Sequence, residues 1–197
     1  MLRLAQQAPS WCNTQPWQVF VTSGDATERF RDGLIAYVEA RGTNGVAADP
    51  DLAFPPGYEG VLRERRRECG WQLYNSLGIA AGDRVASTRQ MKENFRLFGA
   101  PHILVLAAER SLGSYGLLDC GAYLGTLLLA ATGLGVATIA QAAIAGCAPF
   151  VREFFGVSDD LAVLVGVSFG YRDEDHPANG FRTHRAALAD VAHWAER

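Results

Sequence analysis

Polar side chains able to recognise a heterocycle gather near the start of the chain. The stretch lies between two prolines and contains Pro9, Ser10, Asn13, Gln15 and Pro16. Its hydroxyl and amide groups both donate and accept hydrogen bonds, and none of them is an acid or a base at neutral pH. The simpler interpretation is a capped turn, which Ser and Asn form often.

A second polar stretch lies near the other end of the chain, directly after an apolar run. It reads GYRDEDHPANGFRTHR and contains Asn179, Arg182, His184 and Arg185. A pair of arginines can bind a phosphate group through charge-assisted hydrogen bonds, although a solvated basic loop would have the same composition. Taken together, the two stretches indicate a site for a cofactor that itself does the chemistry.

Other catalytic patterns are missing from the sequence. It contains no phosphate-binding G-x-x-x-x-G-K-[ST] loop, no G-x-S-x-G turn and no pair of histidines spaced for a metal ion. The run GLGVAT at 133–138 has Thr138 where a dinucleotide-binding fingerprint needs its third glycine. Cys12 has no base nearby in the sequence, so we interpret it as a packing residue.

The composition predicts one globular domain over residues 1–197. Hydrophobic residues make up 49% of the chain and charged residues 20%, and the formal net charge is −3. Neither nucleic acid nor an anionic membrane is therefore an expected partner. The four cysteines show no C-x-x-C pair, and the first residues do not form a secretory signal. These features indicate a cytoplasmic protein with reduced thiols.

The stretch 120–151 contains no charged residue and no histidine. An uncharged stretch of this length could span a bilayer. Gly133 and Gly135 in its middle, Gln141 and Pro149 interrupt it, and its flanks show no excess of positive charge on one side. This favours a buried helix followed by a buried loop or strand. The helix, about 14 residues from Asp119, is apolar nearly all round and must be buried on every side, which predicts a partner subunit.

The two polar stretches need a scaffold, and periodicity predicts most of it. The chain should begin inside a helix that ends before Pro9, and strands are expected at 17–21, 102–108 and 161–171. Further helices are expected at 25–41, capped by Asp25 and Thr27, and at 58–77, 83–97, 149–157 and 188–197, with a loop at 43–57. The buried face of 58–77 would contain Leu62, Cys69, Leu73 and Leu77. Helices interleaved with buried strands predict a three-layer α/β or α+β sandwich.

The first polar stretch also carries a family resemblance. The pattern Ala8-Pro9-Ser10-x-x-Asn13-x-Gln15-Pro16-Trp17, followed by a strand, resembles the signature loop of the FMN-dependent nitroreductases. The segments YEGVLRERRRECGWQLYNSLGI and NFRLFGAPHILV and the tail GYRDEDHPANGFRTHRAALADVAHW are similar to a bacterial NAD(P)H nitroreductase subgroup. The resemblance extends from about Ala5 to Trp194.

This resemblance implies an α+β fold: a three-layer α-β-α sandwich with a central, mainly antiparallel sheet, in an intertwined homodimer with two interface FMN sites. The helix from Asp119 would be the central dimer helix. Pro9, Ser10, Asn13 and Gln15 would line the flavin ring of a site shared with the partner. Gln141, Ala142 and Ala143 would pass the flavin N5 edge and supply a backbone N–H, and Arg182 and Arg185 would bind the FMN phosphate.

The implied activity is an oxidoreductase that passes electrons from NAD(P)H to small, flat nitroaromatic or quinone-like acceptors by a ping-pong mechanism. The flavin would do the chemistry, so no protein residue is expected to be catalytic. Alternatives are a flavin-dependent dehydrogenase or reductive dehalogenase of the same fold, with the acceptor set by loops such as 43–60. A flavin-poor relative without enzymatic activity is a further alternative.

The family's Arg-Ser-x-Arg element, which grips the phosphate and ribityl chain, has no counterpart upstream of the signature loop. We therefore expect either a start codon further upstream or a naturally shortened protein. In both cases, the 197-residue chain should bind FMN more weakly than an extended version.

Overall fold

The computed structural model describes residues 1–42 and 49–195. The chain forms two compact units: Met1–Phe54 with Thr88–Arg172, and Pro55–Ser87 with Asp173–Arg197. The first unit contains the sheet and the second contains helix α3. The predicted loop at 43–57 lies partly outside the described residues. Its remainder contains no helix, and only a single bridge between Asp49 and Cys147.

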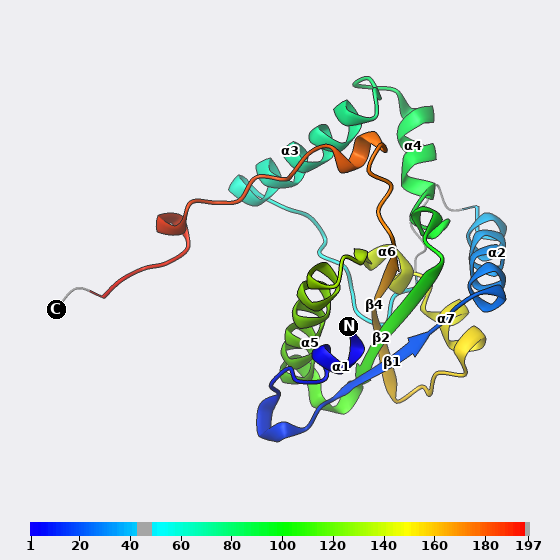
Figure 1. Ribbon diagram of the computed structural model, residues 1–197, viewed down its shortest axis with the longest axis vertical. Coiled ribbons are helices and arrows are strands. Elements are labelled where there is room, and N and C mark those ends of the chain that lie inside the picture. The colour runs from blue at the N-terminus through cyan, green and yellow to red at the C-terminus, as the bar shows by residue number, and fades with distance from the viewer. Residues whose placement is uncertain (43–48, 196–197) are drawn as a thin grey trace. The chain divides into compact units, whose positions relative to one another are not determined.

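The first unit is built on a four-stranded antiparallel sheet in the order β1-β2-β4-β3, of which Figure 1 labels β1, β2 and β4. Its strands are β1 (Trp17–Val21), β2 (His102–Glu109), β3 (Ala137–Gln141) and β4 (Leu161–Gly170). The three predicted strands are confirmed. β3 falls in the interrupted apolar stretch and forms one edge of the sheet, where Ile139 is 42% exposed. The expectation that this segment is buried is therefore only partly met.

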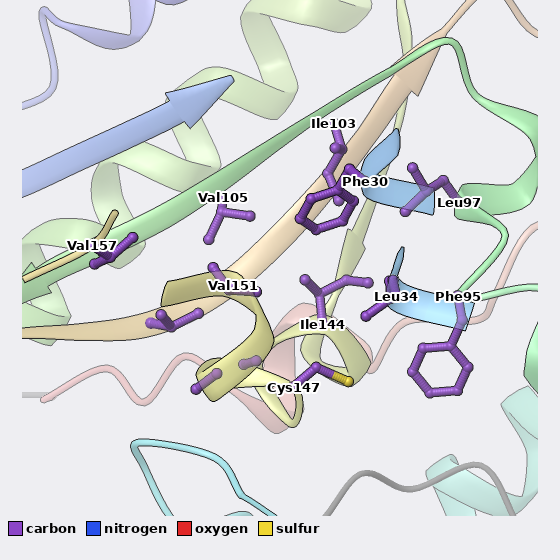
Figure 2. Packing of buried hydrophobic residues seen from close by; sticks show 14 of the residues in the cluster. Phe30, Leu34, Phe95, Leu97, Ile103, Val105, Ile144, Cys147, Val151 and Val157 are labelled. Atoms are coloured by element: carbon purple, nitrogen blue, oxygen red, sulfur yellow. The ribbon is translucent and has the colours of Figure 1, made fainter. Parts of the chain in front are cut away.

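Helices cover both faces of the sheet, because β2 directs alternate side chains into two separate clusters. Ile103 and Val105 contact a cluster that includes residues of α2 (Asp25–Ala40), α6 (Ala142–Ala145) and α7 (Ala148–Phe155), as Figure 2 shows. Leu104 and Leu106 pack on the other face with residues of α1 (Leu2–Ala5) and α5 (Gly113–Gly133). The predicted three-layer α-β-α sandwich is confirmed.

Helix α5 is longer than predicted and only partly buried. It begins at Gly113 instead of Asp119 and spans 21 residues. One side packs on the sheet through residues such as Tyr123 and Leu127, whereas Leu118 is 66% and Leu129 is 76% exposed. Burial on every side is therefore wrong for the single chain. By length and composition alone, one described helical stretch, Arg110–Gly133, could cross a membrane, and 28% of its apolar window is buried.

The second unit departs most from the prediction. Helix α3 (Gly60–Ser76) forms as expected, but none of its residues, all of which are described, is buried. Leu62 is 55% exposed, so the predicted buried face is wrong for this chain alone. The expected C-terminal helix is reduced to one 3₁₀ turn, Leu188–Asp190, because so short a helix needs packing that Trp194, 84% exposed, does not provide. The last two residues lie outside the described part.

Two helix boundaries also differ from the expected ones. Helix α4 (Arg84–Lys92) ends before the predicted Leu97, where Leu97 and Phe98 adopt left-handed backbone conformations (φ 58° and 52°) that no helix continues through. The predicted caps of α2 are wrong: its N-cap is Gly24, and Thr27 forms a buried hydrogen bond with Thr22 at 2.8 Å. The hydroxyl of Thr27 therefore pairs with that of Thr22 in the core and does not cap the N-terminus of α2.

Candidate functional site

The signature loop, Pro9–Gln15, is fixed to helix α5 by a buried carboxylate. The backbone N–H of Trp11 donates to both oxygens of Asp119, at 3.2 Å to Oδ1 and 3.1 Å to Oδ2. The Trp11 ring also packs edge-on against Tyr115, with 4.2 Å between ring centroids. Asp119 is 9% exposed. The loop that precedes the edge strand β1 is therefore positioned by the helix that covers one face of the sheet.

The backbone of the loop is strained. Cys12, Asn13 and Gln15 have φ values of 51°, 58° and 49°, a region that costs most L-residues roughly 1–2 kcal/mol and that Asn tolerates best. Ser10 offsets part of this cost, since its carbonyl accepts the Asn13 N–H at 3.0 Å and its Oγ accepts the Gln15 N–H at 2.9 Å. Strain held by such contacts is typical of binding loops.

The polar side chains of the loop differ in how many hydrogen bonds they make to the protein. Gln15 Nε2 donates to the Asn13 carbonyl at 3.1 Å, and Gln15 Oε1 accepts from Gln6 Nε2 at 3.2 Å. The Asn13 side-chain amide makes no hydrogen bond to any described residue. Both side chains are exposed. Asn13 can thus offer a donor and an acceptor to a ligand, and Gln15 has one further amide hydrogen.

Two apolar hollows flank the point where the loop meets α5. The larger, about 520 Å³, is lined by Pro9 and Ser10 and by Leu117, Leu118 and Ala122 of α5. The smaller, about 240 Å³, lies by Trp11, Cys12 and Tyr115. Asp119 lines both. The hollows belong to the exposed face of α5, and neither is lined by Asn13 or Gln15.

The predicted second segment, Gln141–Ala143, lies where β3 passes into α6. The Gln141 side chain is 2% exposed and is already fully engaged: its Nε2 donates to the Asn94 carbonyl at 2.7 Å, and its Oε1 accepts from the Ser168 hydroxyl. Ala142 and Ala143 begin α6, and the first N–H groups of a helix have no partner within it. A ligand role of this segment therefore stays a prediction that depends on its backbone.

A glycine allows α6 to approach the sheet. Gly166 of β4 is the register partner of Gln141, and a Cβ built on it would lie 2.7–2.9 Å from side-chain atoms of Ile144. Any larger residue would push α6 away from β4. The position of Ala142 and Ala143 thus depends on the absence of a side chain at Gly166.

The signature loop and the α6 segment lie at opposite edges of the sheet. Trp17, at the start of β1, pairs with Ala108, whereas Gln141, at the end of β3, pairs with Gly166. Two strands, β2 and β4, separate the edges. Three inter-strand spacings of about 4.8 Å place the two segments on the order of 14 Å apart across the sheet. The structure therefore does not bring these two groups of predicted residues together within one chain.

The two predicted phosphate-binding arginines belong to the second unit. Both are exposed, and one terminal nitrogen of each is held by nearby backbone: Arg182 donates to the Phe181 carbonyl at 2.8 Å, and Arg185 donates to the His184 carbonyl at 3.0 Å. His184 Nδ1 lies 2.6 Å from Glu68 Oε1 of α3. The remaining N–H groups of each guanidinium can bind an anion, so this role stays a prediction.

Two of the four thiols, Cys120 and Cys147, are buried. Burial, reinforced by the negative charge of Asp119, raises the pKa of Cys120 to about 11. Burial likewise raises the pKa of Cys147 to about 12. Both groups are therefore protonated at neutral pH and poor nucleophiles. All four cysteines are free thiols.

Sequence reasoning missed two residues that organise the loop. Asp119 was interpreted as the start of α5, although an acid inside an otherwise apolar stretch is a signal that it has a buried partner. Gln6 had no such signal, because its contact with Gln15 exists only once the chain folds back on itself.

Comparison with known proteins agrees with this architecture. Residues 1–171 match the model of the nitroreductase family. The chain is 38% identical over 197 residues to nitroreductase NfnB of Mycolicibacterium smegmatis, covering 99% of this chain and 81% of that protein. It is 33% identical over 186 residues to a 4-nitrobenzoate reductase of Nocardioides sp., covering 94% and 75%.

The fold is shared with a solved structure as well. The crystal structure of the FMN-dependent nitroreductase NfnB from Mycobacterium smegmatis in complex with NADPH superposes with a TM-score of 0.91. The two chains are 36% identical, over 98% of this chain and 85% of that one. On the match of the family model, the sequence identity and the fold, this chain belongs to the nitroreductase family.

Proposed function

We propose that this protein is an FMN-dependent oxidoreductase that passes electrons from NAD(P)H to nitroaromatic or quinone-like acceptors. The observation that carries the proposal is the signature loop: a strained, anchored segment in which the Asn13 amide has no partner among residues 1–42 and 49–195. The relatives support it, since one is an FMN-dependent enzyme bound to NADPH and another reduces 4-nitrobenzoate.

The donor set of the chain fits FMN. The pyrimidine edge of a flavin alternates carbonyl oxygens with an N–H group, and Asn13 and Gln15 offer amide donors and acceptors to such an edge. Pro9 would pack against the ring, and Ser10 keeps its hydroxyl hydrogen for a ring acceptor, because its Oγ already accepts from Gln15. Arg182 and Arg185 would bind the phosphate.

Bound FMN would supply the redox chemistry, in which NAD(P)H and one proton convert a nitro group into a nitroso group, water and NAD(P)⁺. The chain would contribute orientation and electrostatics. Backbone N–H groups of Ala142 and Ala143 would stabilise negative charge at the nearby ring edge, as preorganised donors do. Gln141 would hold that segment in place through Asn94 and Ser168.

We propose further that the active form is a homodimer whose sites combine both copies. Two observations support this. The loop and α6 lie at opposite edges of one sheet, which is too far apart for a single ring edge to touch both easily. The exposed face of α5, with Leu118 and Leu129, is apolar and would be covered by the second copy. Burial of this face predicts an interface above roughly 2,000 Å².

The free state of the four thiols is consistent with a cytoplasmic location, which we propose for this chain. The acceptor would be a small, flat aromatic molecule that enters after the nicotinamide leaves, and neither nucleic acid nor a membrane is an expected partner.

The test is purification followed by an absorbance spectrum and a turnover assay. We expect a yellow protein whose oxidation of NADPH depends on added 4-nitrobenzoate or a quinone. Halogenated phenols, tested in parallel, separate this activity from reductive dehalogenation. A colourless protein that does not take up added FMN would contradict the proposed activity. A protein that sediments as a monomer at micromolar concentration would contradict the proposed site shared between two copies.

A further inference from the structure

We propose that Gln6 is a positioning residue that determines which end of the Gln15 amide faces the bound ring. The proposal rests on the FMN site proposed above. It comes from a chain of hydrogen bonds that runs from strand β1, through α1's C-terminal flank, into the signature loop. Each link of that chain has a donor and an acceptor whose identity can be worked out.

The first link has a fixed direction. The indole Nε1 of Trp17 can only donate a hydrogen bond, and it lies 3.1 Å from Gln6 Oε1. Trp17 is 5% exposed, lies on β1 and stacks against Tyr123 with 4.9 Å between ring centroids. The indole donor that begins this series of hydrogen bonds is therefore held rigidly. The amide atom of Gln6 that faces it must be the oxygen.

The direction is passed on to Gln15. Because the Gln6 oxygen faces Trp17, its amide nitrogen must donate, and it lies 3.2 Å from Gln15 Oε1. Gln15 Nε2 then donates to the backbone carbonyl of Asn13 at 3.1 Å. A carbonyl can only accept. The chain thus begins at a group that only donates and ends at a group that only accepts, so rotating either amide would create contacts between like groups.

The consequence concerns the ligand. Gln15 Nε2 uses one hydrogen for the Asn13 carbonyl, and its second hydrogen has no acceptor among the described residues. A bound heterocycle must therefore present an acceptor, such as a ring carbonyl oxygen, to Gln15. If the Gln15 amide rotated, its oxygen would face that ring oxygen and binding would weaken.

This role is separable from the folding of the loop. The loop backbone is anchored through Trp11 to Asp119 and through Ser10 to the Gln15 N–H. Neither contact involves Gln6, which is exposed. A change at Gln6 should therefore leave the loop folded while it releases the orientation of the Gln15 side chain.

The experiment compares Gln6→Glu with Gln7→Glu. Glutamate at position 6 can still accept from Trp17, but a carboxylate cannot donate to Gln15. Gln7 is also exposed and takes the same charge change one residue away, so it controls for electrostatics. Apo-protein of each variant and of the wild type is titrated with FMN by quenching of flavin fluorescence. We expect the Kd to rise about 3- to 10-fold for Gln6→Glu and less than about 2-fold for Gln7→Glu.

A second readout does not depend on bound cofactor. In ¹⁵N-labelled apo-protein, the Gln15 side-chain amide should give one sharp pair of NMR signals in the wild type and in Gln7→Glu. In Gln6→Glu and in Trp17→Phe, which removes the fixed donor, these signals should shift or broaden. Wild-type protein that fails to bind FMN would overturn the proposed function. Wild-type binding with equal losses in both glutamate variants, or unchanged Gln15 signals in Gln6→Glu, would overturn the role of Gln6.

Discussion

Asp119 and Trp11 are joined by a three-centre hydrogen bond: one backbone N–H is shared between both oxygens of a nearly buried carboxylate. The two residues are 108 positions apart in the sequence. Through this contact, helix α5 holds the start of the signature loop. A shift of α5 relative to the sheet would therefore also move the loop that contains Asn13 and Gln15.

Replacing Asp119 by Ala should weaken cofactor binding and stability together. The variant loses a charge-assisted hydrogen bond of about 1.5–3 kcal/mol, which allows the strained loop to relax. FMN affinity should fall about 10-fold or more, and the thermal midpoint should fall as well. Asp119→Asn, which retains one acceptor oxygen, should lose less. Asp32→Ala on the exposed side of α2 is the control, and an equal effect there would refute the anchoring role.

Asn13→Ala should impair FMN binding, whereas Cys12→Ala should not. The two neighbours share a left-handed backbone, so Cys12→Ala shows what an alanine does beside Asn13 in the same conformation. Loss of a hydrogen-bonding amide at a buried ring edge is expected to cost about 1–3 kcal/mol, or roughly 5- to 100-fold in Kd. Titration of the two apo-proteins with FMN measures this. Loss of activity in Cys12→Ala alone would point to thiol chemistry instead.

Arg185→Ala should weaken FMN binding by roughly 10- to 100-fold, because a charge-assisted bond to phosphate is lost. Riboflavin, which has no phosphate, provides the control ligand. Its affinity should be the same for Arg185→Ala and for the wild type. If both ligands lose affinity equally, Arg185 acts on the fold and not on the phosphate.

Alkaline pH should destabilise the protein through its buried thiols. The pKa of Cys120 is raised from 9.0 to about 11 and that of Cys147 to about 12, mainly by burial. The unfolded chain therefore loses these protons first as pH rises. The stabilising contribution is complete below about pH 9 and is lost between pH 9 and about 12. Melting temperatures measured from pH 8 to 11 should fall less steeply for Cys147→Ala than for the wild type, whereas Cys69→Ala, an exposed thiol, should match the wild type.

The sequence predicted the sheet well where the pattern depends on burial alone. β2 and β4 are continuous apolar runs covered on both faces, and such runs can hardly form anything else in an antiparallel sandwich of this size. The start of α5 was placed at Asp119 instead of Gly113, and the glycines at 113 and 116 give little local preference for a helix. In the fold, a Cβ at Gly116 would lie 2.7 Å from Leu112 Cβ, so the glycine serves packing.

The site was predicted in part for a different reason. Residue types located the signature loop, since its amides and prolines are distinctive even without a fold. The direction of each hydrogen bond could not be predicted, because it depends on Trp17, Gln6 and Gln15 meeting in space. Whether the apolar face of α3 is buried could not be predicted either, because periodicity shows which side of a helix is apolar but not what covers it.

The placement of the loop and α6 at opposite edges of the sheet has a consequence for genetics. In a homodimer whose sites each combine the loop of one copy with α6 of the other, damage to the loop and damage to α6 would complement each other. A mixed dimer of a copy carrying Asn13→Ala and a copy carrying Gly166→Ala would have one site with both lesions and one with neither. Two impaired alleles of this gene, expressed in the same cell, would then give more activity than either allele alone.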